Sequence, residues 1–298
     1  MLRAPRRKVS REERRHFFKT SIAVGATVLL AILDVPEIAA SELNNYDNLL
    51  EYWTNDGKYN VFPVGENETA FRSDKVNIAL RHDVDFDNGF LMAKADMAHG
   101  IRSTFCLRYN SKDSPTPPDC LYSYEDEKFK SFYRNAEENG IEIGYHYEVV
   151  DKILGMDGVG NAIEKIKSDN SIPDNIKKIM MDVILGNSGI AINNEIKKEL
   201  ASMRGYFGSV KTVASHGGNF SYLLRSSDKW EGLKKELSII SAYELQLTDM
   251  GYISDMGYSS SSGESIYDFL VRNLKRFDPP ARLEILAHTN KYTYRSGY

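Results

Sequence analysis

The stretch that decides the fold reads Val76-Asn77-Ile78-Ala79-Leu80-Arg81-His82-Asp83-Val84-Asp85. Its apolar residues predict a buried strand that ends in charged side chains. Because side chains alternate along a strand, Asp83 and Asp85 point to the same face. Neighbouring carboxylates repel one another unless a cation lies close to them. The stretch therefore indicates a metal site, with a pair of helix-capping acids as the structural alternative.

Helices and strands alternate along the chain after this stretch. We predict further strands at 101–108, 141–148, 210–216, 239–242 and 282–288, and helices at 90–99, 125–139, 229–237 and 266–275. Helices dominate residues 159–204, with breaks near Pro173 and Gly186, and form an insertion that resembles a lid or a helical layer. Such alternation favours parallel β/α units, whose functional groups lie at the carboxyl ends of the strands.

Four of the six histidines fall at the carboxyl ends of predicted strands: His82, His146, His216 and His288. Any one of them alone would be explained as a hydrogen-bonded packing residue, but together they favour a shared site. Histidine and aspartate form a ligand set that suits zinc and similar divalent ions. An apolar strand that delivers His288 at its end suits a general acid or base.

The ordered motifs resemble the polysaccharide deacetylase superfamily, or NodB-homology domain, in its branch whose first motif reads His-Asp-Val-Asp. The match spans residues 76–289 and rests on Arg81-His82-Asp83-Val84-Asp85, Gly100-Ile101-Arg102-Ser103-Thr104-Phe105, Glu142-Ile143-Gly144-Tyr145-His146-Tyr147-Glu148, His216-Gly217 and Leu286-Ala287-His288. The resemblance implies an α/β fold: a distorted (β/α) barrel of fewer than eight strands, here with the helical insertion.

The resemblance also implies roles for individual residues. Asp83 would be the catalytic base and Asp85 a metal ligand, although the two roles could be reversed. His146 would be a second ligand and His288 the general acid.

The chain departs from the family pattern in three places. Val150 stands where the second motif usually has another histidine, Val84 separates the usually adjacent aspartates, and the Arg-Pro-Pro-type third motif is missing. We therefore expect His216 to supply the missing metal ligand, with Glu148 as the other candidate.

Several further residues are candidate substrate contacts: Tyr145, Tyr147, Glu148, Tyr222, Trp230 and Asp255. The aromatic rings could stack on sugars, although packing explains each of them as well. Asp255 could contact substrate, orient a histidine or form a turn.

The expected activity is metal-dependent removal of N-acetyl groups from an amino-sugar polysaccharide or glycoconjugate, with zinc as the default ion. One alternative is a metal-dependent amidohydrolase that acts on a small amide. Another is a catalytically inactive carbohydrate-binding protein, which the missing histidine at Val150 would favour.

The first residues resemble an export signal of the twin-arginine type, with Arg14-Arg15 before an apolar run at 22–33. That run is shorter than the roughly 20 residues needed to span a bilayer, so we expect export rather than a stable membrane span. The predicted division is 1–41 signal, 42–75 lead-in with a local helix near Trp53, and 76–298 catalytic domain.

The charge of the chain bears on its binding partners, and its cysteine content bears on disulfide formation. Residues 1–40 hold eight Lys or Arg and four Asp or Glu, so the remainder holds 30 basic and 38 acidic residues. Such an acidic chain is a poor partner for nucleic acid. Cys106 and Cys120 could form a disulfide or remain thiols. The sequence does not predict the oligomeric state.

Overall fold

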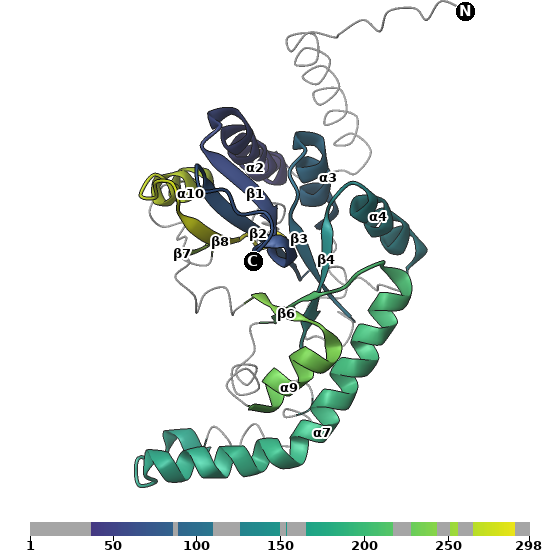
Figure 1. Ribbon diagram of the computed structural model, residues 1–298, viewed down its shortest axis with the longest axis vertical. Helices are drawn as coiled ribbons and strands as arrows, with labels where there is room; N and C mark the ends of the chain where they lie inside the picture. The colour runs from purple at the N-terminus through teal and green to yellow at the C-terminus, as the bar shows by residue number, and fades with distance from the viewer. Residues whose placement is uncertain are drawn as a thin grey trace, which may run out of the picture.

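A parallel sheet with helices packed against it forms the centre of the fold (Figure 1). The computed structural model describes residues 37–85, 89–109, 126–149, 153, 165–216, 228–242, 251–255 and 265–289. Its elements are α2 (Glu37–Asp56), β1 (Tyr59–Pro63), η1 (Val64–Glu66), β2 (Val76–Val84), α3 (Gly89–His99), β3 (Thr104–Arg108), α4 (Glu127–Glu138), β4 (Glu142–Tyr147), α7 (Asp174–Tyr206), β5 (Thr212–Ser215), α9 (Asp228–Leu237), β6 (Ile240–Ser241), β7 (Gly251–Ser254), α10 (Ile266–Leu274) and β8 (Arg282–Leu286).

Within the described residues the sheet has eight strands, and every pairing is parallel. Seven strands follow one path, β6-β5-β4-β3-β2-β8-β7, which curls as part of a barrel (Figure 1). β1 pairs with the first half of β2, and β3 pairs with the second half on the same edge. The predicted α/β class is therefore confirmed, with a curled parallel sheet.

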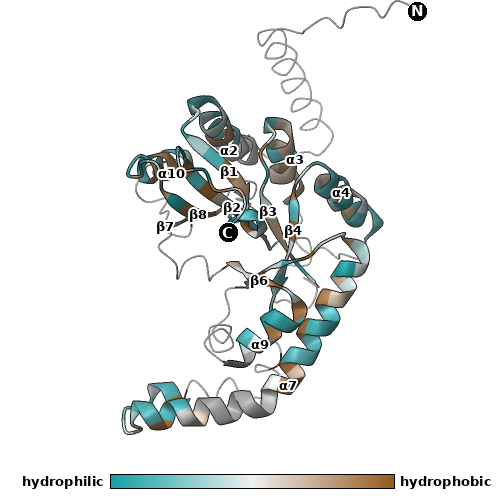
Figure 2. Ribbon diagram, in the orientation of Figure 1, coloured by the Kyte–Doolittle hydropathy of each residue, from teal (hydrophilic) through white to brown (hydrophobic). Residues whose placement is uncertain are grey.

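β2 is the central strand, and all nine of its residues are buried. Its alternate residues face opposite sides of the sheet. His82 contacts helices α2 and α3, which cover one side. Arg81 and Asp83 therefore face the other side, where Ala79 packs with other small residues such as Cys106 and Ala214. Figure 2 shows hydrophobic residues along β2 and β8 and a mostly hydrophilic α4.

The segment expected to be a lead-in contributes to the core. Helix α2 buries Tyr46, Leu49, Leu50 and Trp53, which lie at helical spacing on one face. This segment also contains β1, a strand that the sequence analysis did not predict. The first part of the chain that the structure describes thus packs with the sheet as one body.

Other parts of the prediction have different outcomes. The helix predicted to break near Gly186 is continuous, since α7 runs from Asp174 to Tyr206 and begins directly after Pro173. β7 was not predicted.

Residues 1–36 of the expected export signal lie outside the described residues, and residues 37–41 begin α2. Among the described helices, none combines the length and apolar character needed to cross a membrane. Cys106 is a buried thiol in β3, while Cys120 lies outside the described residues.

Candidate metal centre

Three side chains from different strands meet at one edge of the sheet. Asp85 follows β2, His146 lies in β4 and His216 follows β5. One ligand atom from each residue lies within 4.8 Å of the other two. Because β3 separates β2 from β4 in the sheet, the curl is what brings these strand ends together. The group could hold a metal ion.

The distances fit a small divalent cation. Asp85 Oδ1 lies 3.3 Å from His146 Nε2 and 3.3 Å from His216 Nε2. Two ligand atoms held tetrahedrally by zinc, at bond lengths of about 2.0–2.1 Å, lie about 3.3–3.4 Å apart. One carboxylate and two imidazoles also form a donor set that such ions favour. Both the spacing and the chemistry of the three residues therefore suit a metal.

The charge on Asp85 is retained although its side chain is only 14% exposed. Burial raises the pKa of this carboxyl, but hydrogen bonds and charge from His146 and His216 outweigh that effect and lower it well below the usual range. Burial likewise lowers the pKa of His216, whereas its hydrogen bonds to Asp85 and Glu148 raise it to about 9. The carboxylate is thus ionised and ready to bind a cation.

Glu148 lies behind His216 rather than in the ligand group. Its Oε1 is 2.6 Å from His216 Nδ1, the ring nitrogen that does not face Asp85. Its other oxygen forms an ion pair with Arg108. Burial raises the pKa of Glu148, but His216 and Arg108 lower it overall. Of the two candidates for the missing ligand, the structure therefore brings His216 to Asp85 and His146, and Glu148 orients it.

Asp83 lies beside this group and is held by an arginine. Its Oδ2 is 4.0 Å from His146 Nε2. Arg81 Nε lies 3.1 Å from the other carboxylate oxygen of Asp83, Oδ1. Arg81 Nη1 also lies 2.7 Å from Glu284 Oε1. All three charged residues are buried. The role of Arg81 was not predicted, although an arginine two residues before Asp83 in a buried strand is a usable signal.

His288 follows β8, the neighbour of β2, and is held by Asp255. Its Nδ1 lies 2.7 Å from Asp255 Oδ1, and its backbone N–H donates to Asp255 Oδ2 at 2.7 Å. Burial lowers the pKa of His288, but Asp255 and the charges of Asp83 and Asp85 raise it overall. Among the roles considered for Asp255, the structure therefore favours orientation of a histidine.

Two residues from the sequence analysis lie away from the centre. His82 faces the helices, where its Nε2 is 3.0 Å from the Tyr46 hydroxyl and 3.2 Å from Asp96. It therefore does not share the site of the other three strand-end histidines. Tyr147 is buried, and its ring packs 5.7 Å from that of Trp230. Packing therefore accounts for Tyr147 in this structure, and its expected contact with substrate stays a prediction.

Packing likewise accounts for two other aromatic candidates. Tyr145 and Trp230 are buried in the core, and their expected contact with sugars stays a prediction. Tyr222 lies outside the described residues.

No protein-family model, curated protein or solved structure matches this chain.

Proposed function

We propose that this protein is a metal-dependent hydrolase that removes N-acetyl groups from an amino-sugar polysaccharide or glycoconjugate. The single observation that carries the proposal is the Asp85–His146–His216 group, within contact distance of Asp83. His288 stands on the adjacent strand end with Asp255. A candidate base and a candidate acid beside a cation site are the parts that amide hydrolysis requires.

The metal would be held by Asp85, His146 and His216, with zinc as the first choice. A bound divalent ion of this kind polarises a carbonyl and brings the pKa of water to about 7. The ordered motifs and the curled parallel sheet support a polysaccharide deacetylase-like, distorted (β/α) barrel.

Asp83 is the proposed general base. It takes a proton from the water that attacks the acetyl carbonyl carbon, and a carbon–oxygen bond forms. Arg81, 3.1 Å away, keeps this carboxylate oriented toward the site. Asp85 belongs to the ligand group through its 3.3 Å contacts, which supports Asp83 rather than Asp85 in the role of base.

His288 is the proposed general acid. When the carbon–nitrogen bond breaks, it donates a proton to the departing amine nitrogen, which is otherwise a poor leaving group. The products are acetate and a free amino sugar. The raised pKa of His288 keeps this proton in place above the ordinary range of histidine. Asp255 holds Nδ1, so that Nε2 is the nitrogen that donates.

The geometry bears on the inactive-protein alternative as well. That alternative depended on the missing histidine at Val150. His216 reaches Asp85 from another strand and so can replace that ligand, which supports an enzyme. An amidohydrolase that acts on small amides would use the same groups and differs only in substrate.

Acetate release from N-acetylglucosamine oligomers, measured with added zinc, cobalt or manganese, tests the proposal. We expect release by the wild-type chain, and a loss of about 10²–10⁴-fold in Asp83→Asn, the scale of general-base catalysis. Asp83→Asn should still bind the metal. The exposed Tyr252→Phe is a control. Absence of acetate with all three ions, or full activity in Asp83→Asn, would contradict the proposal. Release of ammonia or amine from small amides alone would favour the amidohydrolase.

A further inference from the structure

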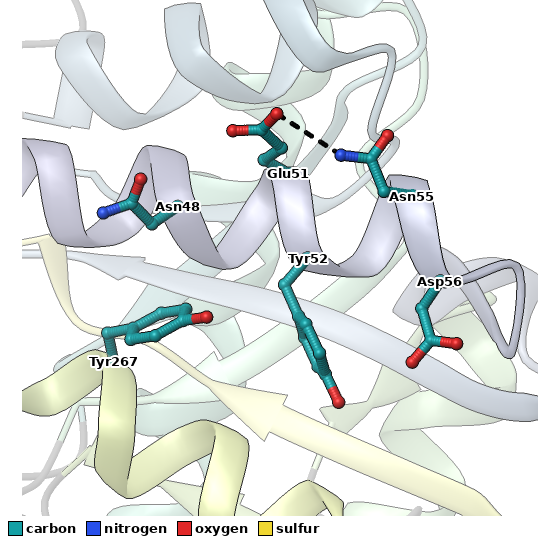
Figure 3. A pocket seen from close by; sticks show the side chains of 6 residues that line it. All are labelled: Asn48, Glu51, Tyr52, Asn55, Asp56 and Tyr267. Atoms are coloured by element: carbon teal, nitrogen blue, oxygen red, sulfur yellow. Dashed lines mark hydrogen bonds between the residues drawn. The ribbon is translucent and has the colours of Figure 1, made fainter.

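A separate pocket lies on the solvent-facing side of α2, where α10 packs beside it (Figure 3). Its volume is about 500 Å³, which is enough for one or two sugar rings on the scale of ligand sites. Six side chains line it: Asn48, Glu51, Tyr52, Asn55, Asp56 and Tyr267. None of them belongs to the candidate metal centre, so the pocket has no part in the proposed reaction.

Two tyrosines supply the apolar surface of the pocket. Tyr52 comes from α2 and Tyr267 from α10, and both are half-buried. The Tyr52 hydroxyl is 3.0 Å from that of Tyr59, and the two rings pack 5.4 Å apart. Tyr267 packs against the hydrophobic core. Both rings are therefore held before a ligand arrives, which limits the entropy lost on binding.

The remaining lining residues are exposed and polar. Asn48 and Asn55 can both donate to and accept from hydroxyl groups. Asn55 donates to Glu51 at 3.3 Å, which holds that carboxylate at the rim (Figure 3). Glu51 and Asp56 are acidic, and no Lys, Arg or His is among the six lining residues. The pocket thus combines aromatic faces, amides and a net negative charge.

Each of these features selects a property of the ligand. Tyrosine faces favour a ring with an apolar side or a cation placed above them. The amides favour a ligand with several hydroxyls, and the carboxylates favour a positive charge. An amino sugar with a free ammonium group has all three properties, whereas its N-acetylated form lacks the charge.

We propose that this pocket binds a glucosamine-type unit of a partly deacetylated polymer and so anchors the polymer on the protein. The polymer is the one assumed in the proposed function, and the inference rests on that function for its biological sense. The acidic excess after residue 40, with 38 acidic and 30 basic residues, also attracts a polycation over a longer range. Product units would then hold the chain while neighbouring units react.

Calorimetric titration with a glucosamine tetramer, and in parallel with an N-acetylglucosamine tetramer, tests this inference. The full chain carrying Asp85→Ala serves as the reference, because its metal group is disabled while the pocket is intact. We expect it to bind the glucosamine tetramer as the wild type does, and more tightly than the acetylated tetramer. Binding should weaken as salt rises, since the charges are exposed.

The variant Glu51→Gln with Asp56→Asn removes the charge at exposed positions with little risk to folding. In the Asp85→Ala background it should weaken glucosamine binding by about tenfold, on the scale of two exposed charge contacts. Tyr267→Ala should weaken both tetramers, and the exposed Tyr252→Ala is the matched control. Thermal unfolding confirms that each variant is folded.

The outcomes separate this inference from the proposed function. Undetectable glucosamine binding, binding unchanged in Glu51→Gln with Asp56→Asn, or equal binding of both tetramers would overturn the pocket assignment. Acetate release from short substrates should be unchanged in that variant. If acetate release fails in the wild type while pocket binding persists, the proposed function is wrong and the binding site stands.

Discussion

At the residue scale, His216 makes a different contact through each of its ring nitrogens. Nε2 faces Asp85 at 3.3 Å, and Nδ1 lies 2.6 Å from Glu148. A neutral imidazole carries hydrogen on only one nitrogen. Because Glu148 can only accept, it holds a hydrogen on Nδ1, so that a metal which displaces the hydrogen of Nε2 would find the lone pair of Nε2 available.

Replacement of Glu148 should therefore weaken metal binding without removing a ligand. We expect Glu148→Ala to raise the zinc dissociation constant by about 10–100-fold. Glu148→Gln should lose less, because its side-chain oxygen still accepts from Nδ1. Competition with a chelator of known affinity measures both. Equal affinity in wild type and Glu148→Ala would show that Glu148 does not orient His216.

Asp255 should control the alkaline limb of activity. His288 must be protonated to act as an acid, so activity falls as pH rises through its pKa, which Asp255 helps to raise. Asp255→Asn removes that charge, and the alkaline limb of kcat/KM should move to lower pH. The pH profile of kcat/KM for both proteins measures the shift. An alkaline limb at the same pH in both would show that His288 is not the acid.

The ligand group could be predicted from strand ends together with the family resemblance, whereas most of the supporting contacts could not. The resemblance implied Asp85 and His146 as ligands, and His216 was expected to replace the histidine missing at Val150. The partners depend on how the sheet curls: Glu148 reaches His216 from β4, and Asp255 reaches His288 from the end of β7. His82 was grouped with the other strand-end histidines, but the alternation of side chains along β2 turns it toward the helices.

At the scale of elements, α2 is joined to the sheet by a buried polar network. The Tyr46 hydroxyl donates to Asp96 on α3 and lies 3.0 Å from His82 on β2. Ser103 also donates to Asp96, and His82 Nδ1 donates to the carbonyl of Ala287, beside His288. This network connects α2 with the strand ends that carry Asp83 and His288.

Removal of the Tyr46 hydroxyl should therefore destabilise the whole fold. Tyr46→Phe leaves buried Asp96 short of one donor, and we expect a loss of about 1–3 kcal/mol in the free energy of unfolding. Urea denaturation measures it, with the exposed Tyr252→Phe as a control that should change little. A Tyr46→Phe protein as stable as wild type would mean that the hydroxyl contributes nothing to the attachment of α2.

Most elements were predictable because their apolar patterns are long enough to be recognised locally. Strands β1 and β7 were not predicted, although strands of similar length were. Tyr59–Pro63 pairs with β2 and Gly251–Ser254 pairs with β8, and neither pairing can be read from the local sequence. Gly186 was expected to break a helix. Glycine costs only about 1 kcal/mol in a helix, which the many hydrogen bonds of the 33-residue α7 can outweigh.

At the scale of the whole molecule, the curl of the sheet brings the ligand residues of the candidate metal centre together. Asp85 and His216 are 131 positions apart in the sequence, and three strand steps separate β2 from β5 in the sheet. A flat sheet would hold these strand ends more than 10 Å apart, since neighbouring strands are about 4.8 Å apart. The 3.3 Å contact therefore depends on the curl.

The most direct test of a cation held by Asp85, His146 and His216 is titration of the metal-free protein with zinc. The titration is repeated with cobalt, whose absorption spectrum reports its coordination geometry. We predict one equivalent bound per wild-type chain, with a tetrahedral cobalt spectrum. Asp85→Ala and His216→Ala should each lose that binding, while His99→Ala, a histidine outside the site, should keep it. Absence of binding by the wild type, or full binding by both ligand variants, would contradict the account.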